Sequence, residues 1–419
     1  MKFLFTNKFF YIKGGAENSF FLTADLLKKH GHEIIYFSMQ DNRNIPSEFG
    51  KYFIRNVDYD TKDPISKISS IAKLFYSFEA KRKIDQLIKD TRPDIIYLNN
   101  IYHQISPSIL HAIKKHDIPV VMALRDYKVS CGSYAMSDPE GRICEACKGN
   151  KYYHCFLKKC SYNSRISSAI ITAEMYLHHN LLRIYDLVDV FISLSVFLKD
   201  KVKEMGFKGE VAHLPNFVYP DEFIPSYENT ERSICYIGRL SKEKGIFTLI
   251  NAVKGFDITL KIIGDGPDRS ALEAQVRRDQ MSNVSFLGYK YGEELKQEIK
   301  SSMFTVIPSE WYENNPRSVI ESFALGKPVV GARIGGIPEL VIDSETGLTF
   351  TPFDTADLRS KISLLLATPA LIPQMGRNAR QMVENELNAD KYYTRIMDIF
   401  SKAKAKHEPK TTQKDPFNK

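Results

Sequence analysis

The sequence lacks an uncharged apolar stretch of the roughly 20 residues that a membrane-spanning helix needs. Residues 1–15 are apolar and basic, but they lack the long apolar core and the small-residue cleavage site of a secretory signal. There is no solenoid repeat and no stripe of arginine and aromatic residues that would favour RNA. We therefore expect a cytoplasmic protein, soluble or peripheral on the inner face of a membrane, that does not bind nucleic acid.

The composition is that of a globular protein, with 43% hydrophobic and 26% charged residues in a chain of 419. This length predicts two or three domains with sizeable cores. The net charge is +8, and residues 402–419 supply +4 of it, from six lysines less Glu408 and Asp415. We expect residues 402–419 to be a disordered basic tail. Positive charge also suits a phosphate-bearing substrate or an anionic membrane surface.

Short apolar runs alternate with helical patterns, which is typical of parallel sheets with crossover helices. A proline-rich linker at residues 214–229 separates two such series. The pattern predicts an α/β fold with two Rossmann-like domains, residues 1–213 and 230–388, facing each other across a cleft. A helix at residues 389–401 is expected to cross back to the first domain. The expected strands are 2–6, 33–38, 94–98, 120–124, 190–194, 234–237, 259–263, 284–286, 304–307 and 328–331.

The most informative segment, Ser309–Val341, places two carboxylates around the start of a predicted helix. Glu313 and Glu321 are separated by seven residues, and Pro316 between them suits the first turn of that helix. A loop that ends in a helix N-terminus binds anions. If most of the interval is helical, the carboxylates lie roughly 10 Å apart, too far for the catalytic pair of a retaining glycosidase. This spacing suits the two ends of a sugar nucleotide.

A second loop carries two cations between a predicted strand and a predicted helix. Gly238 allows close approach of the backbone, and Arg239 and Lys244 can both reach a pyrophosphate from there. A solvated basic turn is the alternative interpretation of this loop.

These motifs together resemble glycosyltransferase family 4, whose members have the GT-B fold. The motifs are G-R-L-S-x-E-K-G, I-x-G-D-G-P, F-L-G, P-S-E-W-Y-E-x-x-P-x-x-V-x-E and G-G-I-P-E-L-V, in that order. The resemblance is strong from Ile234 to Leu348. It implies retaining transfer, without a metal cofactor, from a UDP- or GDP-sugar to a hydroxyl of a glycan or polyprenyl-linked oligosaccharide. The alternatives are a GT-B sugar-nucleotide epimerase and a non-catalytic sugar-nucleotide-binding protein.

The resemblance also implies roles for individual residues of the second domain. Arg239 and Lys244 match the pair that neutralises the donor diphosphate, and Glu313 matches the glutamate that contacts the donor sugar. Glu321 matches the glutamate that binds the ribose hydroxyls. Other positions lie where the family contacts the sugar, the phosphates or the base: Asn314, Asn315, Pro316, Gly266 and Leu287.

In the first domain, Gly14 and Gly15 resemble the glycine loop that faces the donor diphosphate and the acceptor, although a plain helix-entry turn has the same pattern. His103 follows a predicted strand, where ligands bind in such sheets; a locally hydrogen-bonded histidine is the alternative. Arg125 stands where many family members have a histidine that contacts the donor sugar. Arginine can bind a carboxylate or phosphate of donor or acceptor, or it can pair with Asp126.

Five of the six cysteines fall between residues 131 and 160, which we interpret as an insertion in the first domain. Cys144 and Cys147 have the spacing of a zinc knuckle, and a reducing cytoplasm argues against disulfides. A similar insertion occurs in a subset of family-4 enzymes. It implies that Cys131, Cys144, Cys147 and Cys160 bind a structural zinc, with His154 and Cys155 as substitute ligands. Free thiols in an acceptor loop are the alternative.

An apolar stripe at helical spacing lies within residues 61–92, among eight basic and four acidic side chains. It predicts either an interfacial helix on anionic lipid or an ordinary helix packed on the first domain. The stripe consists of Ile68, Ile71, Leu74, Phe75 and Phe78.

Overall fold

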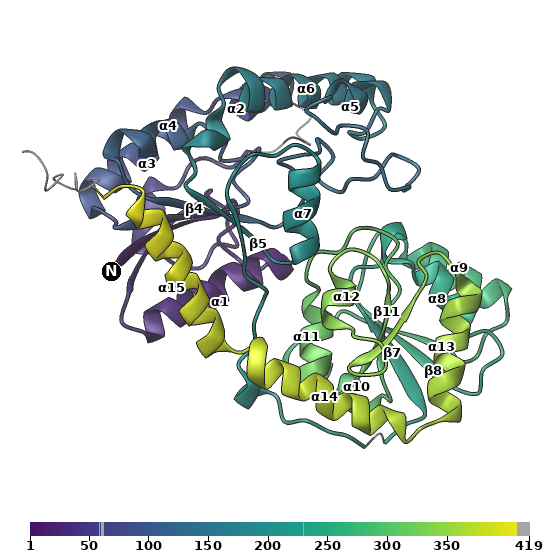
Figure 1. Ribbon diagram of the computed structural model, residues 1–419. Helices are drawn as coiled ribbons and strands as arrows, with labels where there is room; N and C mark the ends of the chain where they lie inside the picture. The colour runs from purple at the N-terminus through teal and green to yellow at the C-terminus, as the bar shows by residue number, and fades with distance from the viewer. Residues whose placement is uncertain (58, 60–62, 229, 409–419) are drawn as a thin grey trace, which may run out of the picture.

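Two parallel six-stranded sheets, each covered by helices on both faces, form two domains (Figure 1). The computed structural model describes residues 1–57, 59, 63–228 and 230–408, with backbone alone at 64–67. The α/β architecture expected from the sequence is confirmed.

The first sheet has the strand order β2-β1-β3-β4-β5-β6. Its two central strands, β3 and β4, are buried at every residue, as in parallel sheets with helices on both faces. The strand β6 is short and was not expected. The strands are β1 (Lys2–Thr6), β2 (Glu33–Phe37), β3 (Ile95–Asn99), β4 (Val120–Leu124), β5 (Val190–Ser193) and β6 (Val211–His213).

Two apolar cores flank this sheet. Phe3 and Phe5 of β1 pack against one face with α1 and α15, while Leu4 points to the other face, towards α3, α4 and α7. The alternation along β1 is the two-residue period of a strand. The helices of this half are α1 (Gly15–Lys29), α2 (Pro64–Phe75), α3 (Phe78–Thr91), α4 (Ile109–Ile113), α5 (Tyr153–Leu157), α6 (Arg165–Tyr176) and α7 (Val196–Glu204).

The second sheet has the order β12-β11-β10-β7-β8-β9. Its strands are β7 (Ser233–Ile237), β8 (Thr259–Ile263), β9 (Val284–Gly288), β10 (Thr305–Ile307), β11 (Val329–Ala332) and β12 (Gly347–Phe350). Its helices are α8 (Ile246–Ala252), α9 (Arg269–Arg278), α10 (Gly292–Ser301), α11 (Arg317–Ala324), α12 (Ile337–Leu340), α13 (Thr355–Ala367) and α14 (Leu371–Glu386).

The last helix, α15 (Ala389–Ala405), leaves the second domain and packs on the first sheet against α1, β4 and β5 (Figure 1). It runs to Ala405 rather than ending at residue 401. Ala403 is fully buried, the following Lys406 forms an ion pair with Glu210, and His407 is hydrogen-bonded to Asp189. These contacts order the start of the segment that we expected to be disordered. Residues 409–419 of the expected tail lie outside the described residues.

The apolar stripe of residues 61–92 is divided between two helices. Leu74 of α2 belongs to the core of the first domain, whereas Ile68 and Phe78 are exposed. Residues 61 and 62 and the side chains of 64–67 lie outside the described residues. None of the described helices combines the length and the apolarity needed to cross a bilayer.

Candidate active site in the interdomain cleft

The loops that follow the carboxyl ends of both sheets meet between the domains, which is where ligands bind in such sheets. Two cavities lie there. The first, called the Arg125 cavity, measures about 200 Å³ and is lined by Gly15, Arg125 and Asp126 of the first domain and by Trp311–Arg317 of the second. The second, called the Glu321 cavity, measures about 210 Å³. Arg317 lines both cavities.

The ion pair between Lys244 and Glu313 joins the two principal motifs of the second domain. Lys244 Nζ lies 2.6 Å from Glu313 Oε1, which also accepts a hydrogen bond from Ser309. Lys244 further lies over the ring of Trp311, the only tryptophan of the chain. Burial by itself would raise the pKa of Glu313, but Lys244 and these hydrogen bonds hold it below its ordinary value. Glu313 is therefore a carboxylate at neutral pH.

Glycines hold the loop of Glu313 in place. Gly336 donates its backbone N–H to the carbonyl of Glu313, and a Cβ atom on Gly336 would lie 1.8 Å from the carbonyl oxygen of Asn314. Gly335 has φ +60° and is similarly close to Glu313. The G-G-I-P-E motif thus positions the loop before α11. Pro316 is the residue that precedes α11 rather than its first residue.

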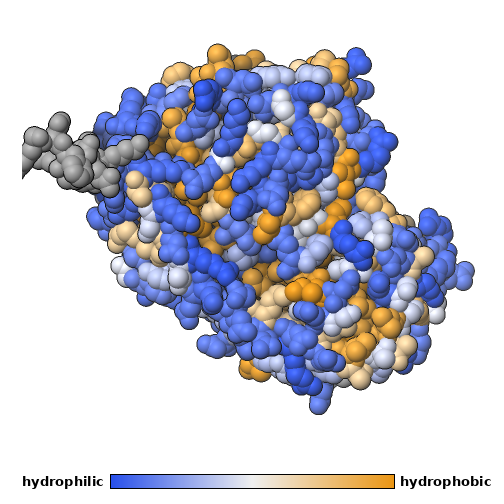
Figure 2. All heavy atoms as spheres, viewed as in Figure 1, coloured by the Kyte–Doolittle hydropathy of each residue, from blue (hydrophilic) through white to orange (hydrophobic). Residues whose placement is uncertain are grey.

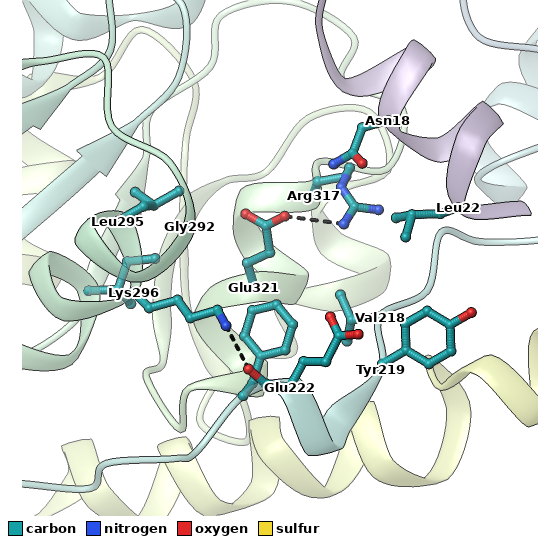
Figure 3. A pocket seen from close by; sticks show the side chains of 12 residues that line it. Asn18, Leu22, Val218, Tyr219, Glu222, Gly292, Leu295, Lys296, Arg317 and Glu321 are labelled. Atoms are coloured by element: carbon teal, nitrogen blue, oxygen red, sulfur yellow. Dashed lines mark hydrogen bonds and ion pairs between the residues drawn. The ribbon is translucent and has the colours of Figure 1, made fainter. Parts of the chain in front are cut away.

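Glu321 lies on α11 and faces the Glu321 cavity (Figure 3). Its carboxylate accepts a hydrogen bond of 3.2 Å from Arg317, one helical turn earlier. Residues of α1 and α10 lie on two sides of Glu321, and Lys296 of α10 donates to the carbonyl of Glu222 (Figure 3). Leu287 belongs to an apolar cluster with two residues of α10, Leu295 and Ile299.

The remaining loop residues of the second domain lie at the same edge of the sheet. Arg239 is exposed immediately after β7. Gly266 packs so closely on the loop of Arg239 that a Cβ atom would lie 2.2 Å from the carbonyl oxygen of Leu240. The glycines of the I-x-G-D-G-P motif therefore fix the two loops against each other.

Gly14 and Gly15 form the N-terminus of α1 at the cleft. Gly15 lines the Arg125 cavity, and a Cβ atom on it would meet nothing within 4 Å. The fold of the protein therefore does not require glycine at position 15, whereas a ligand in the cavity would approach this backbone directly.

Arg125 follows β4 and forms one wall of the Arg125 cavity. Its guanidinium donates to Asn99 Oδ1 at 2.7 Å, to Tyr97 Oη at 3.3 Å and to Asn216 Oδ1 at 3.5 Å. The neighbouring carboxyl of Asp126 instead accepts the backbone N–H of Lys128. Burial raises the pKa of Asp126 to about 6, although that hydrogen bond and the charges of Lys8 and Lys128 oppose the rise.

His103 lies inside the first domain and does not line either cavity. Its Nδ1 is 2.8 Å from the hydroxyl of Tyr134, and its Nε2 is 3.9 Å from Glu174, which pairs with the fully buried Lys128. Burial lowers the pKa of His103 to about 3, so the ring is neutral. The structure thus places it beneath the cleft rather than in it.

The cysteine insertion does not support a structural zinc. Cys131 and Cys147 are buried in the core of the first domain, and burial raises the pKa of both thiols, that of Cys147 to about 12. Within the described part of the chain, Cys131, Cys144, Cys147 and Cys160 are free thiols, and no cluster of three or more histidine, cysteine or acidic residues could hold a metal ion.

The insertion instead crosses to the second domain. Tyr312 donates to Glu145 at 2.7 Å, and Lys242 donates to the carbonyl of Glu140 at 2.9 Å. The insertion therefore borders the cleft beside the loop that carries Glu313, a position that the cysteine spacing did not indicate.

Direct hydrogen bonds between the domains connect residues of the predicted motifs to partners, Ser195 and Asn216, that sequence reasoning missed. The side chain and carbonyl of Asn315 accept two bonds from Asn216 in the linker, and Asn314 accepts one from Ser195. Glu339 of α12 accepts the first two backbone N–H groups of α7. No local pattern marks Ser195 or Asn216, because their partners lie 119 and 99 residues away in the sequence.

The two facing α/β domains, with a charged lysine–glutamate pair in the cleft between them, define a protein of the GT-B glycosyltransferase class. The family profile described as "Glycosyl transferases group 1" matches residues 221–382, and that described as "Glycosyltransferase Family 4" matches residues 13–126. The chain therefore belongs to glycosyltransferase family 4.

Among relatives, the chain is 27% identical to an "Uncharacterized 42.6 kDa protein in cps region" of Klebsiella pneumoniae, over 79% of this chain and 84% of that one. It is 32% identical to "Uncharacterized glycosyltransferase MJ1178" of Methanocaldococcus jannaschii, over 46% of this chain and only 54% of that one.

Solved structures share the fold at lower sequence identity. Sucrose-phosphate synthase from Thermosynechococcus elongatus superposes with a TM-score of 0.72 at 19% identity, covering 97% of this chain and 99% of that one. HepE from Anabaena, solved in complex with UDP and glucose, superposes with a TM-score of 0.67 at 18% identity, covering 96% and 99%.

Proposed function

We propose that this protein is a retaining glycosyltransferase that moves a sugar from a UDP- or GDP-sugar to a hydroxyl of a glycan or lipid-linked oligosaccharide, without a metal ion in catalysis. The Lys244–Glu313 pair is the observation that carries this proposal, because it places a cation and a carboxylate together before the N-terminus of α11. A diphosphate is bound by the cation and the helix N-terminus, and sugar hydroxyls are bound by the carboxylate.

The donor would extend across both cavities. Arg239, Lys244 and the N-terminus of α11 neutralise the diphosphate, where other enzymes use a metal ion. Glu313 accepts hydrogen bonds from sugar hydroxyls in the Arg125 cavity, and Glu321 accepts those of the ribose in the neighbouring cavity. Crystals of the structural relative HepE contain UDP and glucose, which favours a UDP-sugar.

Transfer would take place on one face of the donor sugar. The bond between the anomeric carbon and the diphosphate oxygen breaks, and the acceptor oxygen forms its bond to that carbon from the same side. The acceptor proton passes to the departing phosphate, so the step balances without a protein base. The domains exclude water around this reaction.

The test is transfer with EDTA present, followed by proton NMR of the product anomer. UDP- and GDP-sugars are offered with and without an oligosaccharide acceptor. We expect transfer that needs an acceptor, persists in EDTA and keeps the donor's anomeric configuration. Inversion would contradict the mechanism, and conversion of the sugar nucleotide without an acceptor would favour an epimerase.

We also propose that the first domain meets an anionic membrane carrying a polyprenyl-linked acceptor. Helices α2, α5 and α6 lie along one edge of the molecule, and apolar patches follow that edge in Figure 2. Lys158 and Arg165 add positive charge there. The exposed apolar side chains of this region are Ile68, Phe78, Tyr153, Phe156, Leu157, Ile166 and Leu181.

Co-sedimentation with vesicles tests the membrane proposal. Anionic vesicles should retain the protein, neutral vesicles should not, and Leu157→Asp combined with Ile166→Asp should weaken retention. Equal binding to both vesicle types, or none to either, would overturn it.

A further inference from the structure

The guanidinium of Arg125 lies in the cleft without a counter-charge. Its three hydrogen bonds go to neutral side chains, Asn99, Tyr97 and Asn216, and it forms no ion pair with any residue that the structure describes. The expected alternative of a pair with Asp126 is not realised, because that carboxyl faces Lys8 and the backbone of Lys128.

Two other ionisable pairs lie at the cavity, and the carboxyl of Asp126, which also lines it, accepts the backbone N–H of Lys128 rather than pairing with Arg125. Glu313 pairs with Lys244, and Arg317 pairs with Glu321. A half-buried cation whose hydrogen bonds all go to neutral side chains costs free energy that an anionic ligand would recover. Three of the five N–H groups of Arg125 are used, so two remain for the oxygens of a carboxylate.

The position of Arg125 relates this charge to the sugar. The Arg125 cavity is bounded on its other side by the loop of Glu313. Asn314, the next residue, donates to the carbonyl of Leu124, which precedes Arg125. A ring that contacts Glu313 therefore lies within reach of Arg125. A neutral hexose would leave the guanidinium without a counter-charge, whereas a carboxylate on the ring would supply one.

We propose that Arg125 binds the carboxylate of a hexuronate, and that the donor is a nucleoside-diphosphate hexuronate. This inference rests on the proposed function, because it identifies the sugar that occupies the donor site. Arg125 acts here as a specificity-determining residue and takes no part in breaking the glycosidic bond.

Calorimetric titration tests the inference with matched donors. UDP-glucuronate and UDP-galacturonate are compared with UDP-glucose and UDP-galactose, and GDP-mannuronate with GDP-mannose. The better hexuronate should bind roughly tenfold to a hundredfold more tightly than its hexose, the effect of one charge-assisted contact. Arg125→Gln and Arg125→His should abolish this preference and leave the affinity for UDP or GDP alone unchanged.

Arg183→Gln is the matched control, because Arg183 is exposed and pairs only with Asp186 in the described chain; it should keep the preference. Equal affinity for hexuronate and hexose in the wild-type chain, or a preference that survives Arg125→Gln, would overturn the inference. A third result would also overturn it: methyl glucuronide binds together with UDP and needs Arg125, while the donors show no preference for a hexuronate. The carboxylate that Arg125 binds would then belong to the acceptor and not to the donor. Failure of both UDP and GDP to bind would instead reject the proposed function itself.

Discussion

At the scale of single residues, the cleft contains carboxyl groups with opposite electrostatic environments. Glu313 is buried yet stays ionised, because Lys244 and the hydrogen bond from Ser309 oppose the cost of burial. Asp126 is half-buried on the other wall, and there burial outweighs its partners. Two carboxyl groups in one cavity can therefore differ in protonation near pH 6, which permits different roles.

Glu313→Gln should lower the transfer rate roughly a hundredfold, the usual effect of removing one electrostatic contact to a transition state. It should also destabilise the fold by about 1–3 kcal/mol, because Lys244 loses its charged partner. Initial rates and chemical unfolding measure the two effects. Glu345→Gln, at an exposed position, is the control and should change neither. An unaltered rate in Glu313→Gln would exclude a catalytic role for this residue.

Asp126 should make the stability of the fold depend on pH. Its pKa is about 6 in the folded chain, against an ordinary value of 3.8. The stabilising effect of its proton is complete below pH 3.8 and is lost as the pH rises through 6. Asp126→Asn should therefore gain stability relative to wild type between pH 4 and pH 7.5, by up to about 3 kcal/mol. Unfolding in urea at both pH values checks this, and a pH-independent difference would contradict the shift.

At the scale of elements, the site is built from helix N-termini and the glycine loops before them. Gly15 and Gly336 serve opposite purposes there. Around Gly336 the loop of Asn314 packs so closely that no side chain fits, whereas beside Gly15 there is open space. One glycine supports the fold of the loop, and the other leaves room for the ligand.

Two substitutions separate these purposes. Gly15→Leu should keep the melting temperature of the wild-type chain, since leucine favours helices, but should weaken UDP or GDP binding at least about tenfold by filling the cavity. Gly336→Ala should lower the melting temperature, because its Cβ would overlap the carbonyl of Asn314. Thermal unfolding and calorimetry measure both. Normal nucleotide binding by Gly15→Leu would place the ligand elsewhere.

At the scale of the whole molecule, the domains are joined in four ways. These are the linker, helix α15, the cysteine insertion and a set of polar bonds around Asn314, Asn315 and Glu339. The bonds of Asn314 and Asn315 use the same loop that carries Glu313. Closure of the domains and formation of the donor site are therefore coupled through one segment.

Glu339→Ala should loosen this arrangement, because α7 loses the carboxylate that accepts its first two backbone N–H groups. We expect a larger radius of gyration in small-angle scattering and donor affinity reduced by about tenfold, with both domains still folded. Glu345→Ala, at an exposed position of the second domain, is the control. Unchanged scattering and affinity would show that Glu339 does not hold the domains together.

Much of the architecture could be predicted because parallel strands are continuous apolar runs. Val120–Leu124 and Thr259–Ile263 were found at the positions expected. The strands β6 and β12 were missed because both are short and neither is a continuous apolar run. The strand β6 contains a histidine, and β12 contains a glycine and a threonine. The order of the strands could not be read from local patterns.

The candidate site was predictable where its residues share one motif and not where partners are distant. Glu313 and Lys244 were both identified, but their direct pairing was not. His103 looked like a cleft residue because its buried neighbours, Lys128 and Glu174, lie far along the chain. The C-x-x-C spacing suggested zinc, but spacing does not reveal that two of the proposed ligands are buried in an apolar core.

The most direct test of the central claim is calorimetric titration of UDP and GDP into the wild-type chain and Lys244→Met. Lys254→Met, at an exposed position of the same domain, serves as the control. One nucleotide should bind with 1:1 stoichiometry to the wild type and the control, and at least about tenfold more weakly to Lys244→Met, which lacks the cation for the diphosphate. Binding of neither nucleotide, or equal binding to Lys244→Met, would contradict a donor site in the cleft.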